Sequence, residues 1–111
     1  NDFAVSLLAD GRLQVELFGV DAASGGVFLS QSTFEVGQWY HFAVVYDGSS
    51  EAIYINGVLD TSRAASGVVG NSPQPEDVMI GAYNGSSFFS GSIDDLRITN
   101  YPAPAGTNAL N

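Results

Sequence analysis

Residues 37–60, GQWYHFAVVYDGSSEAIYINGVLD, decide the fold of this 111-residue chain. They hold a long apolar run at Trp39–Tyr46, a turn at Asp47-Gly48, and two shorter runs on either side of Asn56-Gly57. Asn-Gly between two such runs predicts a β-hairpin, because a type I′ turn needs a positive φ at both central positions. In Trp39–Tyr46 both alternating sets of side chains are largely apolar, which predicts a central strand covered on both faces.

The same two-residue period continues outside this stretch. Asp10-Gly11 separates two alternating runs, which predicts a second type I′ hairpin. Its second arm is expected to bury one face through Leu13, Val15 and Leu17. Further strands are expected at Val27–Ser32, Val78–Gly81 and Ser90–Thr99, with a surface loop from Ser62 to Asp77. Helical periodicity is absent throughout, so the pattern predicts an all-β sandwich of roughly seven or eight antiparallel strands.

The charge balance excludes several classes of partner. Lys and Arg total 3 against 12 Asp and Glu, a formal net charge of −9. Such a chain lacks the attraction that supplies non-specific affinity for nucleic acid and for anionic lipid. Its apolar runs are far shorter than the ~20 residues of a membrane-spanning helix. Neither nucleic-acid binding nor membrane insertion is expected.

Three stretches together resemble a known family: residues 37–48, Ile53–Val58, and Ile80-Gly81 followed by Phe89–Ile98. In this order and spacing the chain, from Phe3 to Tyr101, resembles the laminin-G-like jelly-roll domains of the concanavalin A-like lectin/glucanase superfamily. The resemblance implies an antiparallel jelly-roll β-sandwich. It also implies a non-catalytic module of a secreted or surface protein, often carbohydrate-binding or adhesive, and sometimes holding Ca²⁺.

We expect one sandwich domain over residues 1–100 and an extended, proline-containing tail or linker over residues 101–111. Family members usually begin with further strands before the position that matches Phe3. The resemblance therefore implies a jelly roll that is incomplete at its N-terminus. Either the chain is an excerpt of a longer protein, or another polypeptide completes the sheet, since open sheet edges pair with available strands.

A catalytic role is not expected. Retaining glycosidases need two carboxyl groups about 5–5.5 Å apart, and the Glu-x-Asp-x-x-Glu or Glu-x-Asp-x-Glu strand of the family's catalytic members has no counterpart here. Glu76-Asp77 and Asp94-Asp95 are adjacent pairs, whose side chains point to opposite faces of a strand. His41 is interpreted as a histidine of the core, or one that supports a neighbouring group, satisfied by hydrogen bonds. Trp39 is interpreted as a core residue that a sugar cannot reach.

The candidate ligand-binding residues are Tyr83, Asn84 and Phe88. They belong to a loop between expected strands, where rings stay accessible for stacking on a sugar. The alternative is that these rings anchor the loop on the edge of the sandwich.

Asp94 is the candidate metal ligand, with Ca²⁺ as the cofactor. Related folds place a calcium-binding Asp at this position, and calcium prefers carboxylate and carbonyl oxygens. Asp94 also shares parity with Leu96 and Ile98, which predicts a buried side where an unpaired carboxylate is costly. The alternative is that Asp94 caps backbone N–H groups or pairs with Arg97 or Arg63.

Two functions remain open. The first is a non-catalytic carbohydrate-binding or adhesion module whose partner is a glycan or a cell-surface protein. The second is a structural or assembly subunit, by self-assembly or strand complementation, whose open sheet edge is completed by another chain or segment. An extracellular or cell-surface location is expected for both.

Overall fold

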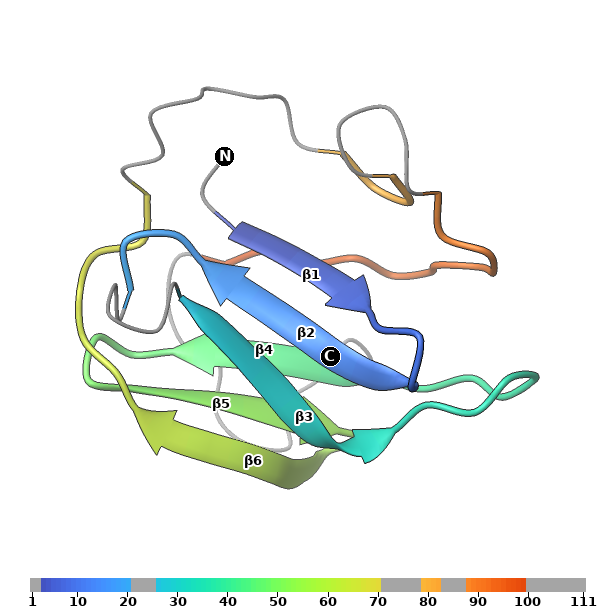
Figure 1. Cartoon of the computed structure of the whole chain (residues 1–111), viewed down its shortest axis with the longest axis horizontal. Helices are drawn as coiled ribbons and strands as arrows, with labels where there is room; N and C mark the ends of the chain where they lie inside the picture. The colour runs from blue at the N-terminus through green and yellow to red at the C-terminus, as the bar shows by residue number, and fades with distance from the viewer. Residues whose placement is uncertain (1–2, 21–25, 71–78, 83–87, 100–111) are drawn as a thin grey trace.

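The protein folds as two antiparallel three-stranded sheets, which confirms the prediction of an all-β sandwich (Figure 1). The computed structural model describes residues 3–20, 26–70, 79–82 and 88–99. One sheet has the order β1-β2-β3, and these strands are β1 (Phe3–Leu7), β2 (Arg12–Leu17) and β3 (Val27–Thr33). The other has the order β4-β5-β6, and its strands are β4 (Phe42–Tyr46), β5 (Ser50–Ile55) and β6 (Val58–Ala64). Within these ranges no helix is long and apolar enough to span a membrane.

The core lies between the two sheets. Alternation along β2 buries Leu13, Val15 and Leu17, as their spacing predicted. Phe28 from β3 and Ile53 from β5 join them in one apolar cluster. Full burial of a side chain of this kind contributes about 1.5–3 kcal/mol, so this shared face holds the sheets together.

The two predicted hairpins form with different turns. Asn56 (φ 53°) and Gly57 (φ 79°) both have positive φ, so the predicted type I′ turn between β5 and β6 is confirmed. Between β1 and β2 only Gly11 has positive φ (91°). The carboxylate of Asp10 accepts a hydrogen bond from the N–H of Arg12 at 3.0 Å. The type I′ prediction at Asp10-Gly11 was therefore wrong, and the loop instead places a lone glycine in the left-handed region.

The strand predicted at residues 39–46 is shorter than expected and is not central. β4 begins at Phe42 and lies at the edge of its described sheet, where β5 is the central strand. Trp39 is 71% exposed, so its assignment to the core was wrong. An apolar run on both parities describes a doubly covered strand, but it describes equally well an edge strand preceded by an exposed apolar loop.

Residues 79–82 and 88–99 form no strand, contrary to the strands predicted at Val78–Gly81 and Ser90–Thr99. Ile93, Leu96 and Ile98 are exposed. A period of two supplies an apolar side, but a strand also needs a neighbour for its hydrogen bonds, and none of the described residues provides one here.

The loop predicted from Ser62 begins later in the chain. β6 continues to Ala64, and Gly67 forms an isolated antiparallel bridge with Val20. Residues 71–77 of that predicted loop lie outside the described residues.

Candidate functional site

The loop of residues 34–41, called here the β3–β4 loop, carries a large exposed aromatic ring, that of Trp39. It extends beyond the ends of the strands that it connects (Figure 1). Trp39 and Val36 on this loop are both exposed, Val36 completely. Of the two, the indole of Trp39 combines a large apolar face with a polar N–H, so it is the candidate contact for a ligand or a partner.

Aromatic stacking and hydrogen bonds hold the β3–β4 loop in shape. The rings of Phe34 and Tyr40 stack with centroids 4.5 Å apart and planes 20° apart. The hydroxyl of Tyr40 accepts a hydrogen bond from the N–H of Glu35 at 2.9 Å. A stacked pair contributes about 0.5–1.5 kcal/mol beyond its buried area. The two ends of the loop are thus tied to each other, with Trp39 between them.

The loop is also tied to the β5–β6 turn. The N–H of His41 donates to Oδ1 of Asn56 at 2.9 Å, and the N–H of Asn56 donates to the carbonyl of His41 at 2.7 Å. His41 is half-buried rather than in the core. Because this reciprocal pair fixes the backbone directly after Tyr40, Trp39 sits on a rigid support.

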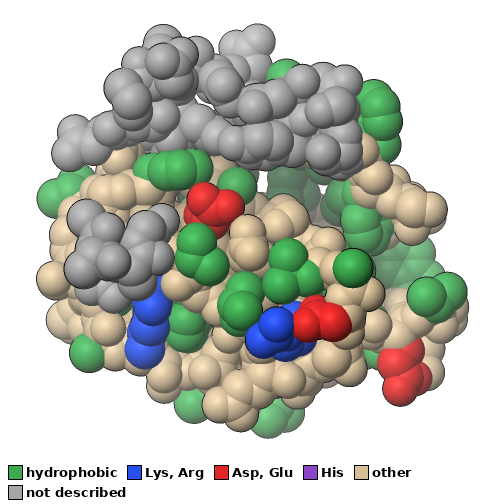
Figure 2. Space-filling model, viewed as in Figure 1, with side chains coloured by type: hydrophobic (Ala, Val, Ile, Leu, Met, Phe, Trp, Pro, Cys, Tyr) green, Lys and Arg blue, Asp and Glu red, His purple; other side chains and the backbone are tan. Residues whose placement is uncertain are grey.

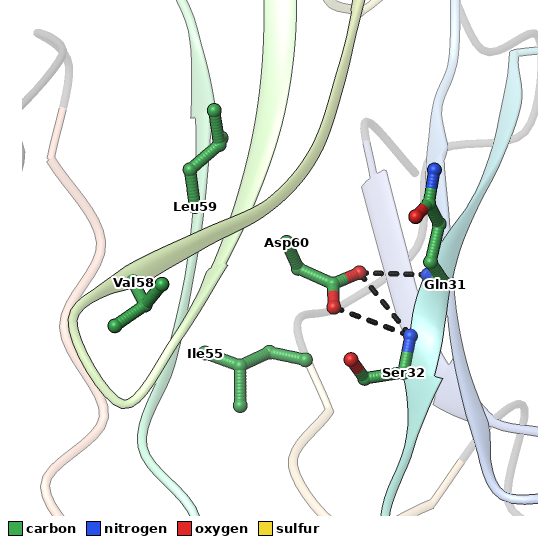
Figure 3. A pocket seen from close by; sticks show the side chains of 6 residues that line it. All are labelled: Gln31, Ser32, Ile55, Val58, Leu59 and Asp60. Atoms are coloured by element: carbon green, nitrogen blue, oxygen red, sulfur yellow. Dashed lines mark hydrogen bonds between the residues drawn. The ribbon is translucent and has the colours of Figure 1, made fainter.

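An open groove of about 400 Å³ lies where β3 approaches β6 (Figure 3). The carboxylate of Asp60 accepts hydrogen bonds from the N–H groups of Gln31 at 2.7 Å and Ser32 at 3.2 Å. Its walls are completed by Ile55, Val58 and Leu59. Backbone N–H groups already bind the Asp60 carboxylate in this groove. It therefore joins the edge strands β3 and β6 and is not presented to a ligand.

The predicted ligand-binding residues are only partly described. Tyr83 and Asn84 lie outside the described residues. Phe88 is 75% exposed, and the N–H of the neighbouring Phe89 donates to the carbonyl of Gly81 at 2.8 Å. Binding of a ligand by Tyr83, Asn84 and Phe88 stays a prediction.

Asp94 is exposed, so the prediction that it lies on a buried strand face with Leu96 and Ile98 was wrong. Once residues 88–99 form no strand, parity no longer directs a side chain inward. Among the described residues no group of three or more His, Cys, Asp and Glu side chains could hold a metal ion. Calcium binding by Asp94 stays a prediction.

The arginines considered as partners of Asp94 pair with other carboxylates. Nε of Arg97 lies 3.3 Å from Asp95, and Nε of Arg63 lies 2.5 Å from Glu51. Glu51 is completely buried. The sequence analysis missed this pair, in which the carboxylate is buried and the guanidinium is half-buried.

Comparison with known proteins identifies the family. Residues 1–106 match a laminin-G-type family model described as the concanavalin A-like lectin/glucanases superfamily. A search of curated proteins finds no match. Among solved structures, the chain is similar to an S-layer domain-containing protein (residues 221–444) from Clostridium thermocellum, with 24% identity and a TM-score of 0.47.

That similarity covers 93% of this chain and 52% of the S-layer structure, so the chain spans about half of its length. The family match covers nearly the whole chain, and the two antiparallel sheets agree with it. The chain therefore belongs to the concanavalin A-like lectin/glucanases superfamily.

Proposed function

We propose that this chain is a non-catalytic carbohydrate-binding or adhesion module that acts outside the cell or at its surface. The observation that carries the proposal is the exposed indole of Trp39 on a braced loop, in a member of a superfamily that includes lectins. An indole combines a flat apolar face with a polar N–H, which suits it to the apolar face and the hydroxyl groups of a pyranose.

The rigidity of the β3–β4 loop favours binding. Ordering a mobile loop on binding costs free energy, and a loop already held by the Phe34–Tyr40 stack and the His41–Asn56 pair avoids most of that cost. A shallow site built on one ring still binds weakly. By analogy with stacking on nucleobases, the ring contributes about 1–3 kcal/mol.

Phe88, together with Tyr83 and Asn84, is the alternative location for the same function. Its ring is as exposed as that of Trp39. The two locations are separable by mutation, because Phe88 and Trp39 lie in different loops.

A glycan array followed by titration of the best binder tests the proposal. Trp39→Ala is expected to weaken binding, whereas Val36→Ala, which removes another exposed apolar side chain from the same loop, is expected to leave it unchanged. A loss in Phe88→Ala alone would move the site to the 83–88 loop. Binding of no glycan at all would contradict the proposed function.

Calcium bound through Asp94 belongs to the proposal. An exposed carboxylate next to Asp95 in a chain of net charge −9 supports it. Ca²⁺ takes about six to eight oxygen ligands, so neighbouring carbonyl groups must complete the site. At 100 times its dissociation constant a ligand adds about 2.7 kcal/mol of stability. A thermal midpoint equal in chelator and in excess Ca²⁺, or raised equally in Asp94→Ala, would contradict this assignment.

A second candidate function, that of an assembly subunit, is favoured by the open side of the sandwich. Phe3, Val5 and Leu7 of edge strand β1 are paired with the buried residues of β2 and share their face, yet they are 36%, 38% and 41% exposed. Phe42 on edge strand β4 is also exposed. An added strand pairing with β1 would cover this apolar surface.

Light scattering over a range of concentrations tests the assembly function. Val5→Lys places a charge on the open apolar face and is expected to abolish association. Ser6→Lys places the same charge on the opposite face of β1 and is expected to preserve it. A wild-type monomer at every concentration would contradict self-assembly.

A further inference from the structure

The chain has few groups that could bind an anion. The sequence contains three arginines, no lysine, and 12 acidic residues. Acidic glycans are recognised through their sulfate or carboxylate groups, for which guanidinium and ammonium groups are the usual partners. Whether the three arginines are already paired with carboxylates therefore decides whether acidic glycans can bind.

Each arginine already lies beside a carboxylate. The pairs, joined through Nε at 2.8, 2.5 and 3.3 Å, are Arg12–Asp10, Arg63–Glu51 and Arg97–Asp95. On the face shown in Figure 2 the basic side chains are isolated from one another and form no continuous basic patch. Each guanidinium group is thus already partly neutralised by a carboxylate, which weakens its attraction for an acidic sugar.

Arg63 is the most firmly held of the three. Its partner Glu51 is completely buried, and its guanidinium lies 4.9 Å from the centre of the Phe28 ring. Recruiting Arg63 to a ligand would leave a buried carboxylate without its counter-ion, which is strongly unfavourable.

Arg12 is more exposed but is held by a turn. The carboxylate of Asp10 accepts hydrogen bonds from both the backbone N–H and the Nε of Arg12. The backbone hydrogen bond is the main cause of the lowered pKa of Asp10, so this carboxylate is ionised at neutral pH. An approaching anion therefore encounters the Arg12–Asp10 ion pair, which has little net charge, rather than an unpaired cation.

The β3–β4 loop adds negative charge close to the proposed site. Its only charged residue is Glu35, whose carboxylate accepts a hydrogen bond from the side-chain amide of Gln38 at 3.2 Å. Carboxylate and amide groups hydrogen-bond well to neutral hydroxyl groups, whereas the carboxylate repels sulfate and uronate. The electrostatic screening length is about 8 Å at physiological ionic strength, so the repulsion by Glu35 persists over the short distances within the loop.

From these contacts we propose that the Trp39 site takes uncharged glycans, which stack a pyranose face on the indole, and that it excludes sulfated, uronic and sialylated glycans. This inference rests on the proposed carbohydrate-binding function and adds the class of ligand to it.

Titration with a neutral β-glucan, a neutral mannan, heparin and polygalacturonate tests the inference, at low and at high ionic strength, with chelator and with excess Ca²⁺. The expected result is binding of a neutral polymer with an affinity that salt does not change, and no binding of heparin or polygalacturonate. Trp39→Ala is expected to weaken neutral binding by roughly 5- to 150-fold, the equivalent of one stacked ring. Val36→Ala serves as the matched control and is expected to bind as the wild type does.

Three results would overturn the inference. Binding of heparin or polygalacturonate, direct or through Ca²⁺, would refute the exclusion of acidic glycans and leave the proposed function standing. Unchanged neutral binding in Trp39→Ala would refute the location. Binding of none of the four polymers would refute both the inference and the proposed function on which it rests.

Discussion

The two long sides of the sandwich differ in whether the groups on their edge strands are bound or exposed. On the side of β3 and β6, the Asp60 carboxylate binds the outward N–H groups of Gln31 and Ser32, which bridges the two sheets. On the side of β1 and β4, apolar residues of both strands stay exposed. Two donors of β3 are thus occupied and are not available to a further strand, whereas the edge with exposed apolar side chains favours one. The Asp60 carboxylate therefore blocks part of the side of β3 and β6, called here the closed side, and leaves the side of β1 and β4, the open side, available to a further strand.

The largest effect is expected from Arg63→Ala, which removes an anchor near the closed side. It leaves Glu51 buried without its ion-pair partner, which costs about 3–5 kcal/mol. Urea denaturation measures the loss. The control is the double variant Glu51→Leu with Arg63→Leu, which removes both charges and is expected to recover most of the stability. Equal stability of wild type and Arg63→Ala would show that the pair does not stabilise the fold.

A smaller contrast separates two leucines that face each other across β1 and β2. Leu13 is buried and its register partner Leu7 is 41% exposed. Leu13→Ala is expected to cost about 2–5 kcal/mol, because it leaves a cavity. Leu7→Ala is expected to cost only about 1 kcal/mol, since much of its side chain already contacts water. Similar losses in the monomer would mean that the β1 side is closed in solution.

Asp60→Ala is expected to cost about 1.5–3 kcal/mol, the range for hydrogen bonds to a charged group. Its more specific effect is on the edge itself. The amides of Gln31 and Ser32 should exchange hydrogen faster, and the variant should associate more strongly than the wild type as its concentration rises. Asp60→Asn keeps an acceptor and is expected to lie between the two. Unchanged exchange at both amides would contradict the closing role of Asp60.

Period and turn chemistry sufficed to predict the parts of the molecule that depend on local sequence. They identified the buried face of β2 and the type I′ turn at Asn56-Gly57. They failed at Trp39 and at residues 88–99, because the cover over a strand and the partner beside it are set by distant residues. Nothing local distinguishes an apolar side chain that will be covered from one that will not.

A register shift explains why the sequence did not predict the Glu51–Arg63 pair. In a regular ladder, counting one residue at a time along both strands from the Asn56-Gly57 turn places Glu51 opposite Ser62. The β5–β6 ladder shifts between Ile53 and Tyr54, which brings Arg63 opposite Glu51 instead. The same shift sits beside Asp60, which reaches across to β3. This irregular pairing therefore sets the positions of both Arg63 and Asp60. The candidate site at Trp39 lies outside the shifted part of the ladder.

The smallest effect concerns acid and the turn that joins β4 to β5. Asp47 accepts hydrogen bonds from the N–H groups of Ser49 at 2.9 Å and Ser50 at 2.8 Å, and these bonds lower its pKa. A carboxyl group whose pKa is lower in the folded state stabilises the fold above its ordinary pKa, and this contribution is lost as the pH falls through the folded value. The wild type should therefore weaken below about pH 4.

Asp47→Asn cannot ionise but keeps a side-chain acceptor for the turn. The variant is expected to lose less stability on acidification than the wild type, so that their thermal midpoints converge as the pH falls. Because Asp47 is exposed, the difference should be small and should shrink further in high salt. Parallel midpoint curves for the two proteins between neutral pH and about pH 3 would show that Asp47 does not contribute to the acid sensitivity of the fold.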